Sequence, residues 1–396
     1  MNIFLIAGEP SGDRLGAALM AGLRALRPDA RFTGVGGPAM QAEGLDSLFP
    51  MQELSVMGIA EIAPKYFHLK RRIRQTADAV LADPPAVLIT IDSPDFCLRV
   101  ARLVKEPAPE IPTVHYVAPS VWAWRPGRAK KMAGVIDHVL ALLPFEPPYM
   151  QAAGMSCDFV GHPVVAEPVA DAAMAQSFRA THGIAADAPL LMLLPGSRRG
   201  EVSRLLPPFG ETVAQLAQQI PGLRVVLPTP AYLKDFVAEA ISDWAAAPIL
   251  LPAPDLQTRV AAFAAADAAL AASGTVSLEL AAQNCPMVIA YDMAPLTLWL
   301  MRRMIRIDTV TLVNLVSETR VVPEFIGKDC RAANLVPALA ALLGGGPEGA
   351  RQAQLDAMAL TILRLGRGGE APGLRAARSV LQYLQAQQMS PGGAGR

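Results

Sequence analysis

The sequence predicts an α/β protein with two Rossmann-like lobes and additional helices at its C-terminal end. Short apolar runs alternate with longer helical patterns, which is typical of parallel strands buried under crossover helices. The alternation is interrupted at Gly161-His162-Pro163 and then restarts. With 396 residues, 52% of them hydrophobic and 18% charged, the chain can bury two cores. Two facing lobes would leave a cleft at the carboxyl ends of their strands, where ligands of this fold class bind.

The predicted elements follow in order along the two lobes. The first lobe, residues 1–163, has predicted strands at Asn2–Ala7, Phe32–Val35, Ala86–Ile91, Thr113–Val117, His138–Leu142 and Asp158–Val160. The second lobe, residues 164–345, has them at Leu190–Leu194, Arg224–Leu227, Ile249–Leu250, Ala268–Ala271 and Met287–Ala290. After Pro323-Glu324 the pattern becomes helical. We expect residues 346–396 to form helices and a tail, with the helices packing back on the first lobe.

Charge and cysteine content exclude several classes of protein. Thirty-five Lys and Arg balance thirty-five Asp and Glu, so no overall field attracts nucleic acid, and any attraction to an anionic membrane must be local. No apolar run approaches the roughly 18 residues of a membrane span. The four cysteines are far apart, without the spacing of metal ligands, which indicates reduced thiols in a cytosolic protein.

The segment Leu194–Glu201 has the pattern of a phosphate-binding turn. It reads Leu-Pro-Gly-Ser-Arg-Arg-Gly-Glu, between an apolar strand and a helical pattern. Backbone N–H groups at a helix N-terminus, together with a guanidinium, form a suitable site for a diphosphate. Ser197 and Arg198 are therefore candidate ligands for it. The alternative is an ordinary strand-to-helix turn with a solvated pair of arginines.

A second turn in the same lobe, Ala272–Glu279, repeats this arrangement. Ser273, Gly274 and Thr275 follow a strand, and Glu279 lies about one turn inside the next helix. A carboxylate at that position can accept hydrogen bonds from both hydroxyls of a ribose. The alternative is a capping box between Thr275 and Glu279, although that motif normally spans three residues rather than four. Two such turns in one lobe favour nucleotide binding.

Asp92 is the candidate general base of the first lobe. It follows the strand that ends at Ile91, and catalytic groups of such sheets lie at the carboxyl ends of strands. The alternative for Asp92 is a turn former, and Asp95 is expected to cap the next helix. The spacing D-x-x-D is not the D-x-D of many metal-dependent sugar transferases, and we expect neither a metal nor a cofactor. The turn after the first strand lacks G-x-G-x-x-G, so a dehydrogenase is weakly supported.

Two further loops of the first lobe are candidates for an acceptor pocket. The loop after Tyr116 holds Ser120, Trp122 and Trp124, and a pair of tryptophans on a connecting loop is costly unless it shapes a pocket. Buried aromatic packing is the alternative. Gly36 and Gly37 belong to a glycine-rich segment that is either a tight turn or a loop facing the substrate. His162, beside the linker, is assigned no chemistry.

These motifs, together and in order, resemble a known family. The resemblance rests on Ala7–Asp13, Gly34–Pro38, Val56–Gly58, Asp92–Phe96, His115–Arg125, Leu143–Glu146, Val160–Pro163, Leu194–Arg198 and Ser273–Glu279. The sequence is similar to the lipid-A-disaccharide synthases, inverting glycosyltransferases of lipopolysaccharide biosynthesis with the GT-B fold. The similarity runs from residue 1 to about Asp329. One departure is Leu312-Val313-Asn314, where the family usually has Leu-Pro-Asn.

The resemblance implies a reaction and a set of site residues. UDP-2,3-diacylglucosamine would donate its sugar to 2,3-diacylglucosamine 1-phosphate, giving a β(1→6) disaccharide 1-phosphate and UDP. Asp92 would be the catalytic carboxylate and Glu9 would line the active site, while Arg198, Thr275, Glu279 and Asn314 would hold the UDP. Two alternatives stay open at this point. One is another enzyme of this fold acting on UDP-sugars, such as a UDP-N-acetylglucosamine 2-epimerase, and the other is a non-catalytic nucleotide-binding module at the membrane.

Lipid substrates would require contact with a membrane. Met57–Arg74 follows apolar and aromatic side chains with a basic cluster that includes Lys70, Arg71, Arg72 and Arg74. Such a segment can insert its apolar face at the headgroup boundary while its cations meet anionic lipid. The alternative is a core-facing amphipathic helix with a solvated basic end, and Leu296–Arg306 is a second basic and apolar stretch. We expect a cytoplasmic protein bound peripherally to the inner face of the inner membrane. The sequence allows a homodimer but does not determine the oligomeric state.

Overall fold

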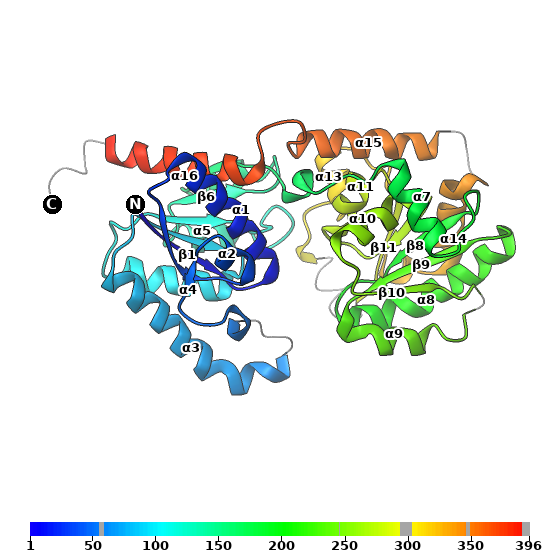
Figure 1. Ribbon diagram of the computed structural model, residues 1–396, viewed down its shortest axis with the longest axis horizontal. Coiled ribbons are helices and arrows are strands. Elements are labelled where there is room, and N and C mark those ends of the chain that lie inside the picture. The colour runs from blue at the N-terminus through cyan, green and yellow to red at the C-terminus, as the bar shows by residue number, and fades with distance from the viewer. Residues whose placement is uncertain (55–58, 245, 294–302, 346–348, 390–396) are drawn as a thin grey trace. The chain divides into compact units, whose positions relative to one another are not determined.

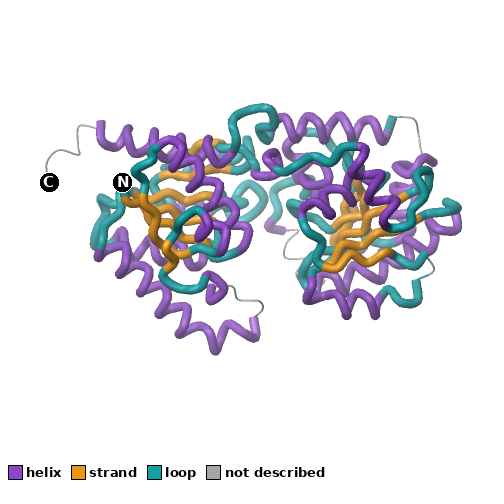
Figure 2. The backbone as a smooth tube through the Cα atoms, viewed as in Figure 1, coloured by secondary structure: helices purple, strands orange, loops and turns teal. Residues whose placement is uncertain are grey.

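The computed structural model describes residues 1–54, 59–244, 246–293, 303–345 and 349–389, and for 59–66 and 345 the backbone alone. The predicted motif Val56–Gly58 and most of the stretch Leu296–Arg306 lie outside the described residues. The chain divides into two compact units. Unit 1 comprises Met1–Ala166 and the chain from Gly368 onward, and unit 2 comprises Glu167–Arg367. Both are α/β, with helices around a parallel sheet (Figure 2), which confirms the predicted fold class.

Unit 1 is built on a sheet in which every described strand pairs in parallel with its neighbours. The strands are β1 (Asn2–Ala7), β2 (Arg31–Val35), β3 (Asp46–Ser47), β4 (Val87–Ile91), β5 (Thr113–Tyr116), β6 (His138–Ala141) and β7 (Ser156–Phe159). Their spatial order is β3-β2-β1-β4-β5-β6-β7. Because β2 and β4 lie on opposite sides of β1, the direction of the connections reverses between β1 and β4.

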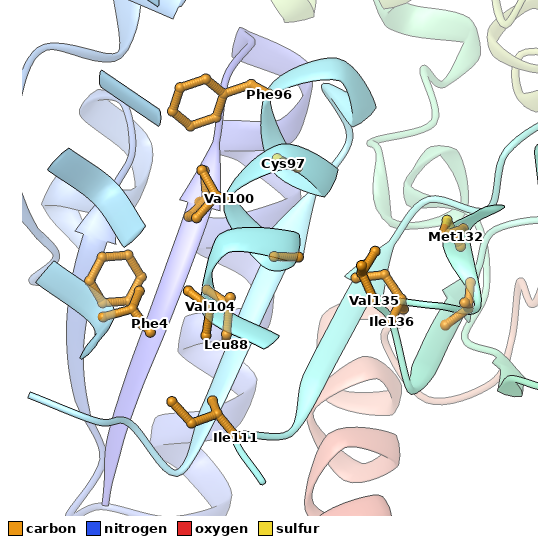
Figure 3. Close-up of a cluster of buried hydrophobic side chains, with 14 of the residues drawn as sticks. Phe4, Leu88, Phe96, Cys97, Val100, Val104, Ile111, Met132, Val135 and Ile136 are labelled. Carbon is orange, nitrogen blue, oxygen red and sulfur yellow. The ribbon is translucent and has the colours of Figure 1, made fainter. Parts of the chain in front are cut away.

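Helices cover both faces of this sheet (Figure 1). They are α1 (Pro10–Leu26), α2 (Pro38–Ala42), α3 (Ile59–Ala82), α4 (Pro94–Lys105), α5 (Gly127–Met132), α6 (Pro147–Gln151) and α16 (Pro372–Met389). Alternate residues of a strand face opposite sides, so Phe4 packs in the cluster under α4, whereas Ile3 packs in the one under α1 and α16. Figure 3 shows the first cluster, in which Phe96 and Cys97 of α4 lie near Val100.

Unit 2 repeats the same strand order. Its described strands are β8 (Leu190–Leu194), β9 (Arg224–Thr229), β10 (Ile249–Pro252), β11 (Ala268–Ala271), β12 (Met287–Tyr291) and β13 (Glu324–Ile326), arranged as β10-β9-β8-β11-β12-β13. Its described helices are α7 (Ala172–Thr181), α8 (Arg199–Gln219), α9 (Lys234–Ala240), α10 (Leu256–Ala265), α11 (Val276–Ala282), α13 (Leu312–Ser317), α14 (Ala332–Ala340) and α15 (Ala350–Arg364). The connections reverse between β8 and β11. Each unit therefore has a topological switch point, where doubly wound sheets bind their ligands.

Three expectations from the sequence differ from the structure. Glu324–Ile326 is an edge strand rather than helix, because it pairs with β12 in a contact that no local pattern encodes. The C-terminal part is divided: α15 packs against α11 and α13 of unit 2, and only α16 packs on α1 of unit 1. The N-cap of α4 is Ser93, which places Asp95 inside the first helical turn.

Candidate functional site

Two carboxylates stand at the switch point of unit 1. Ala7 at the end of β1 is paired with Ile91 at the end of β4, so Glu9 and Asp92 follow neighbouring strands at the same edge of the sheet. The two loops are in close contact, since a Cβ added to Gly8 would lie 2.6 Å from Ser93 Oγ. Glu9 is exposed and Asp92 is half-buried. The structure thus brings together the two acidic residues proposed for catalysis.

The backbone at Asp92 adopts an uncommon conformation. Asp92 has φ +52° and Ser93 has φ +42°, both in the left-handed region that residues other than glycine rarely occupy. The Asp92 N–H donates to the Tyr116 carbonyl (3.0 Å), and α4 begins directly afterwards with Phe96 and Cys97 in the core. Strain of this kind persists only where the surroundings hold it, and it is concentrated at functional sites.

Asp13 holds the glycine-rich loop before α2, a role that the sequence pattern does not indicate. It is buried, and its carboxylate accepts hydrogen bonds from the backbone N–H of Gly37 (2.8 Å), Ala39 (2.9 Å) and Met40 (3.0 Å) at the start of α2. A Cβ at Gly37 would lie 2.5 Å from that carboxylate. Close packing therefore explains Gly37, and Gly36 is buried beside it. The acceptor role of these two glycines stays a prediction.

The tryptophan loop leaves β5 beside Asp92. Its first residue, Val117, has φ +85°, which is a strained value for a β-branched residue. Ser120 is exposed, and Trp122 and Trp124 are half-buried. The Trp122 ring meets Phe145 edge to face at 5.1 Å, and Arg125 lies over the Trp124 ring at 4.4 Å. The loop is thus partly open and next to the carboxylates, as a pocket wall would be.

A pocket of about 430 Å³ lies at the switch point of unit 2. Its lining includes five of the residues predicted to bind UDP: Ser197, Ser273, Gly274, Thr275 and Glu279. These residues come from the loops after β8 and β11, neighbours in the sheet, and the loop after β9 and residues of α10 complete the wall. A pocket of this size fits a small ligand.

The turn between β8 and α8 has the geometry expected for anion binding. Gly196 has φ +104°, and a Cβ there would lie 2.1 Å from a Glu201 carboxylate oxygen. Glu201 accepts a hydrogen bond from the Ser197 N–H (3.2 Å), so a carboxylate already lies against the amides proposed to bind phosphate. Arg198 is the exposed N-cap of α8, and the Tyr232 hydroxyl donates to the Ser197 carbonyl. Burial, and then Glu201, raise the pKa of Tyr291 nearby.

Glu279 is oriented by a residue that the sequence analysis missed. Arg259 of α10 lines the pocket and pairs with Glu279, with 3.3 Å between Nη1 and Oε2. Thr275, the N-cap of α11, makes no side-chain capping bond. The capping-box alternative is therefore not formed in the structure. No motif marks Arg259 in the sequence, because its role depends on an ion pair that joins α10 to α11 only in the folded unit.

Asn314 is not among the residues that line this pocket, and its predicted contact with UDP stays a prediction. Asn314 is buried in α13, where its Nδ2 donates to the Val322 carbonyl (2.9 Å) and to Thr309 Oγ1 (3.2 Å). Its Oδ1 accepts from the Val322 N–H (3.1 Å). These bonds use most of the hydrogen-bonding groups of the Asn314 amide. They indicate that Asn314 holds the segment before β13 in place.

In the basic cluster of α3 one arginine is half-buried and paired, and the other cations are exposed. Arg72 donates two hydrogen bonds of 2.8 Å to Glu53 and lies 4.4 Å from the centre of the Phe49 ring. Lys70, Arg71 and Arg74 are exposed. Phe67, one turn earlier, is 79% exposed. Membrane contact by Arg72 is therefore disfavoured, because its guanidinium is already paired with Glu53.

The histidines and cysteines whose pKa values are shifted are buried. Burial lowers the pKa of His115 and of His162 to about 4, which keeps both neutral at physiological pH. All four cysteines are buried and unpaired, and burial raises their pKa values. Within the described ranges, His, Cys, Asp and Glu do not gather in groups of three that could hold a metal ion.

Comparison with known proteins identifies the family. A model of the family described as lipid-A-disaccharide synthetase matches residues 3–365. A lipid-A-disaccharide synthase of Ruegeria pomeroyi is 62% identical over 390 residues, 97% of this chain and 96% of that protein, and one of Rhodospirillum centenum is 50% identical over 383 residues, 96% and 94%. The crystal structure of a Neisseria meningitidis UDP-GlcNAc 2-epimerase bound to UDP-GlcNAc has a TM-score of 0.66 and 12% identity, covering 98% and 100% of the two chains, which shows the fold alone. By sequence over nearly its whole length, the chain belongs to the lipid-A-disaccharide synthase family.

Proposed function

We propose that this protein transfers 2,3-diacylglucosamine from its UDP derivative to 2,3-diacylglucosamine 1-phosphate. The products are the β(1→6) disaccharide 1-phosphate and UDP. Membership of the family supports the activity. The structural observation that carries the proposal is Asp92, held in a left-handed conformation beside Glu9 at the switch point of unit 1.

Asp92 acts as the general base of this reaction. A sugar hydroxyl attacks the anomeric carbon of the donor, and its proton passes to the Asp92 carboxylate as the new bond forms. The bond from the anomeric carbon to the diphosphate breaks at the same time, and UDP takes the electron pair. Since the donor is α-linked and the product is β-linked, one in-line displacement is enough and no covalent enzyme intermediate is needed.

The pocket of unit 2 holds the UDP. Glu279, oriented by Arg259, accepts hydrogen bonds from the ribose hydroxyls, while Ser273, Gly274 and Thr275 line the same wall. Arg198 and the N-terminal amides of α8 receive the negative charge of the diphosphate as it leaves. Glu201 must give up its hydrogen bond to the Ser197 N–H if the diphosphate takes that amide.

Product analysis tests the proposal against its alternatives. Mass spectrometry of the mixture formed from the two diacylglucosamine substrates should show the disaccharide 1-phosphate, with stoichiometric release of UDP. An epimerase would instead interconvert soluble UDP-sugars without an acceptor, and a binding module would turn over neither. Epimerised UDP-N-acetylglucosamine, or no turnover at all, would overturn the transferase assignment.

We also propose that α3 brings the protein to its lipid substrates. Phe67 offers an apolar contact and Lys70, Arg71 and Arg74 offer cations at a headgroup boundary, at about 1 kcal/mol per charge. In the described part of the chain, no helix is both long and apolar enough to span a membrane. Attachment would then be peripheral, at the cytoplasmic face of the inner membrane. A homodimer stays a prediction that analytical ultracentrifugation can test.

A further inference from the structure

The tryptophan loop of unit 1 is tied to a buried carboxylate outside the loop. The Trp122 indole N–H donates to Glu146 Oε1 (3.2 Å). The other oxygen of Glu146 accepts hydrogen bonds from the backbone N–H of Leu142 (3.1 Å) and of Leu143 (2.9 Å). Phe145, the residue before Glu146, packs edge to face on the Trp122 ring. One short segment after β6 therefore holds both the polar and the apolar sides of this indole.

The location of Glu146 makes this contact relevant to the site. Strands β4, β5 and β6 are neighbours, with Ile91 paired to Tyr116 and Tyr116 paired to Leu140. Asp92, the tryptophan loop and the Leu142–Glu146 segment consequently leave three adjacent strands at the same edge of the sheet. Trp122 therefore belongs to a loop that leaves the sheet on the strand next to the one before Asp92.

A carboxylate in this position is costly to the fold. Glu146 is 3% exposed, and burial raises its pKa to about 7 despite the three hydrogen bonds that favour its ionised form. A titratable neighbour on β7 is Cys157, whose pKa is raised to about 12 by burial first and by Glu146 second. Because burial outweighs these hydrogen bonds, ionisation of Glu146 at neutral pH lowers the stability of the fold. Stability alone therefore does not explain why a carboxylate stands here.

We propose that Glu146 is a positioning residue for the transfer reaction: it fixes the Trp122 indole, and through it the loop that binds the acceptor sugar beside Asp92. The inference rests on the proposed function and adds a residue to it. Trp122 would supply an apolar ring face to the acceptor, and Glu146 would set the direction of that face. Glu146 itself touches neither substrate.

Steady-state kinetics at pH 8 test this role with two conservative variants. Trp122→Phe keeps a ring but removes the N–H, and Glu146→Gln keeps the shape but presents an N–H group where three donors converge. Each should raise the KM for the acceptor about tenfold or more, the effect of losing a hydrogen bond to a charged group. The KM for the UDP donor, kcat and UDP affinity should change little. An unchanged acceptor KM in both variants, with the wild type active, overturns the proposal.

A double-mutant cycle separates positioning from a general structural role. If Glu146 acts through Trp122, the double variant should be no worse than the worse single variant. Trp124→Phe provides the matched control, because Trp124 lies in the same loop but contacts Arg125 instead of Glu146. The fold-changes in acceptor KM caused by Trp124→Phe and Glu146→Gln should therefore multiply in the double variant. If the fold-changes in acceptor KM caused by Glu146→Gln and Trp122→Phe multiplied in the double variant, the inference would be wrong.

Fluorescence supplies a readout that does not depend on activity. Acrylamide quenching, compared between proteins with and without Trp122, isolates the signal of this indole. Glu146→Gln should increase the quenching of Trp122, while thermal unfolding stays cooperative. If Glu146→Gln left the quenching of Trp122 unchanged, the inference would be wrong whatever reaction the wild type catalyses. If the quenching increased but the wild type formed no disaccharide, only the proposed function would be wrong.

Discussion

The two units share a strand order and differ in the chemistry placed at the same point of it. In unit 1 the loops after β1 and β4 carry the carboxylates Glu9 and Asp92. In unit 2 the corresponding loops, after β8 and β11, carry Ser197, Arg198 and Ser273. Parallel sheets aim the carboxyl ends of their strands at one edge whatever side chains follow. The topology therefore determines where a site lies, and the first residues beyond each strand determine its reaction.

The units also differ in how their loops are held. Unit 1 uses buried acids: Asp13 binds three backbone N–H groups at α2, and Glu146 binds two more and an indole. Unit 2 uses a partly exposed pair, Arg259 with Glu279. A buried anchor holds its loop rigidly, while an exposed pair can exchange partners with a ligand. This contrast is what we expect if the proposed catalytic edge of unit 1 is rigid and the proposed nucleotide pocket of unit 2 is adaptable.

The largest expected effect is on chemistry in unit 1. Asp92→Asn keeps the shape of the residue and removes its basicity, so kcat should fall by about two orders of magnitude or more. UDP affinity, measured by calorimetry, should stay within twofold of the wild type because the pocket lies in unit 2. If turnover were nearly normal, Glu9 would become the candidate base.

Protonation of Glu146 should make the stability of unit 1 depend on pH. Because burial raises its pKa from 4.5 to about 7, the folded protein binds more protons than the unfolded chain between these values. Its contribution to the free energy of unfolding is thus fully present below about pH 4.5 and is lost as pH rises through 7, by up to about 3 kcal/mol. Between pH 5 and pH 8, the free energy of unfolding in urea should decline less in Glu146→Gln than in the wild type. If it declined equally in the two proteins, Glu146 would not be the group responsible.

Nucleotide binding in unit 2 should respond to two residues unequally. Arg198→Ala removes a charge-assisted contact to the diphosphate and should weaken UDP binding by about tenfold or more. Glu279→Ala removes ribose contacts and should weaken it less. Arg199→Ala is the matched control, since Arg199 lies over the Phe236 ring instead. Wild-type affinity in both the Arg198 and Glu279 variants would exclude this pocket as the UDP site.

The smallest effect concerns the surface of α3. Arg71→Gln should lower partitioning to anionic vesicles by about fivefold in low salt, the loss of one charge near the surface. Arg72→Gln should instead lower stability, because Arg72 is paired with Glu53. Sedimentation with vesicles and thermal unfolding distinguish the two. Equal partitioning by wild type and a combined Lys70, Arg71 and Arg74 to Gln variant would exclude this surface.

The sequence by itself determined most strands of the two sheets, all but β3 and β13 among those described, and the turns at their switch points. Strands buried on both faces form near-continuous apolar runs, so Asn2–Ala7 and Leu190–Leu194 are predicted with the bounds that the structure has. The loops at the switch points have local signals as well, because Gly196 and Ser273-Gly274 stand directly beyond strand ends. Five predicted UDP ligands consequently meet in one pocket.

Tertiary structure alone decided which polar groups face each other across the chain. Glu146 and Trp122 are 24 residues apart, and Glu279 forms an ion pair with Arg259 of the preceding helix. No local sequence pattern predicts either pair. The edge strand Glu324–Ile326 is recognisable only by its pairing with β12. The hydrogen bonds of Asn314 to Val322 and of Arg72 to Glu53 likewise join residues that no local pattern pairs. The physical reason is that water can satisfy any polar group in the unfolded chain. Only burial in the folded protein requires a specific hydrogen-bonding partner, and the local sequence does not show which group that is.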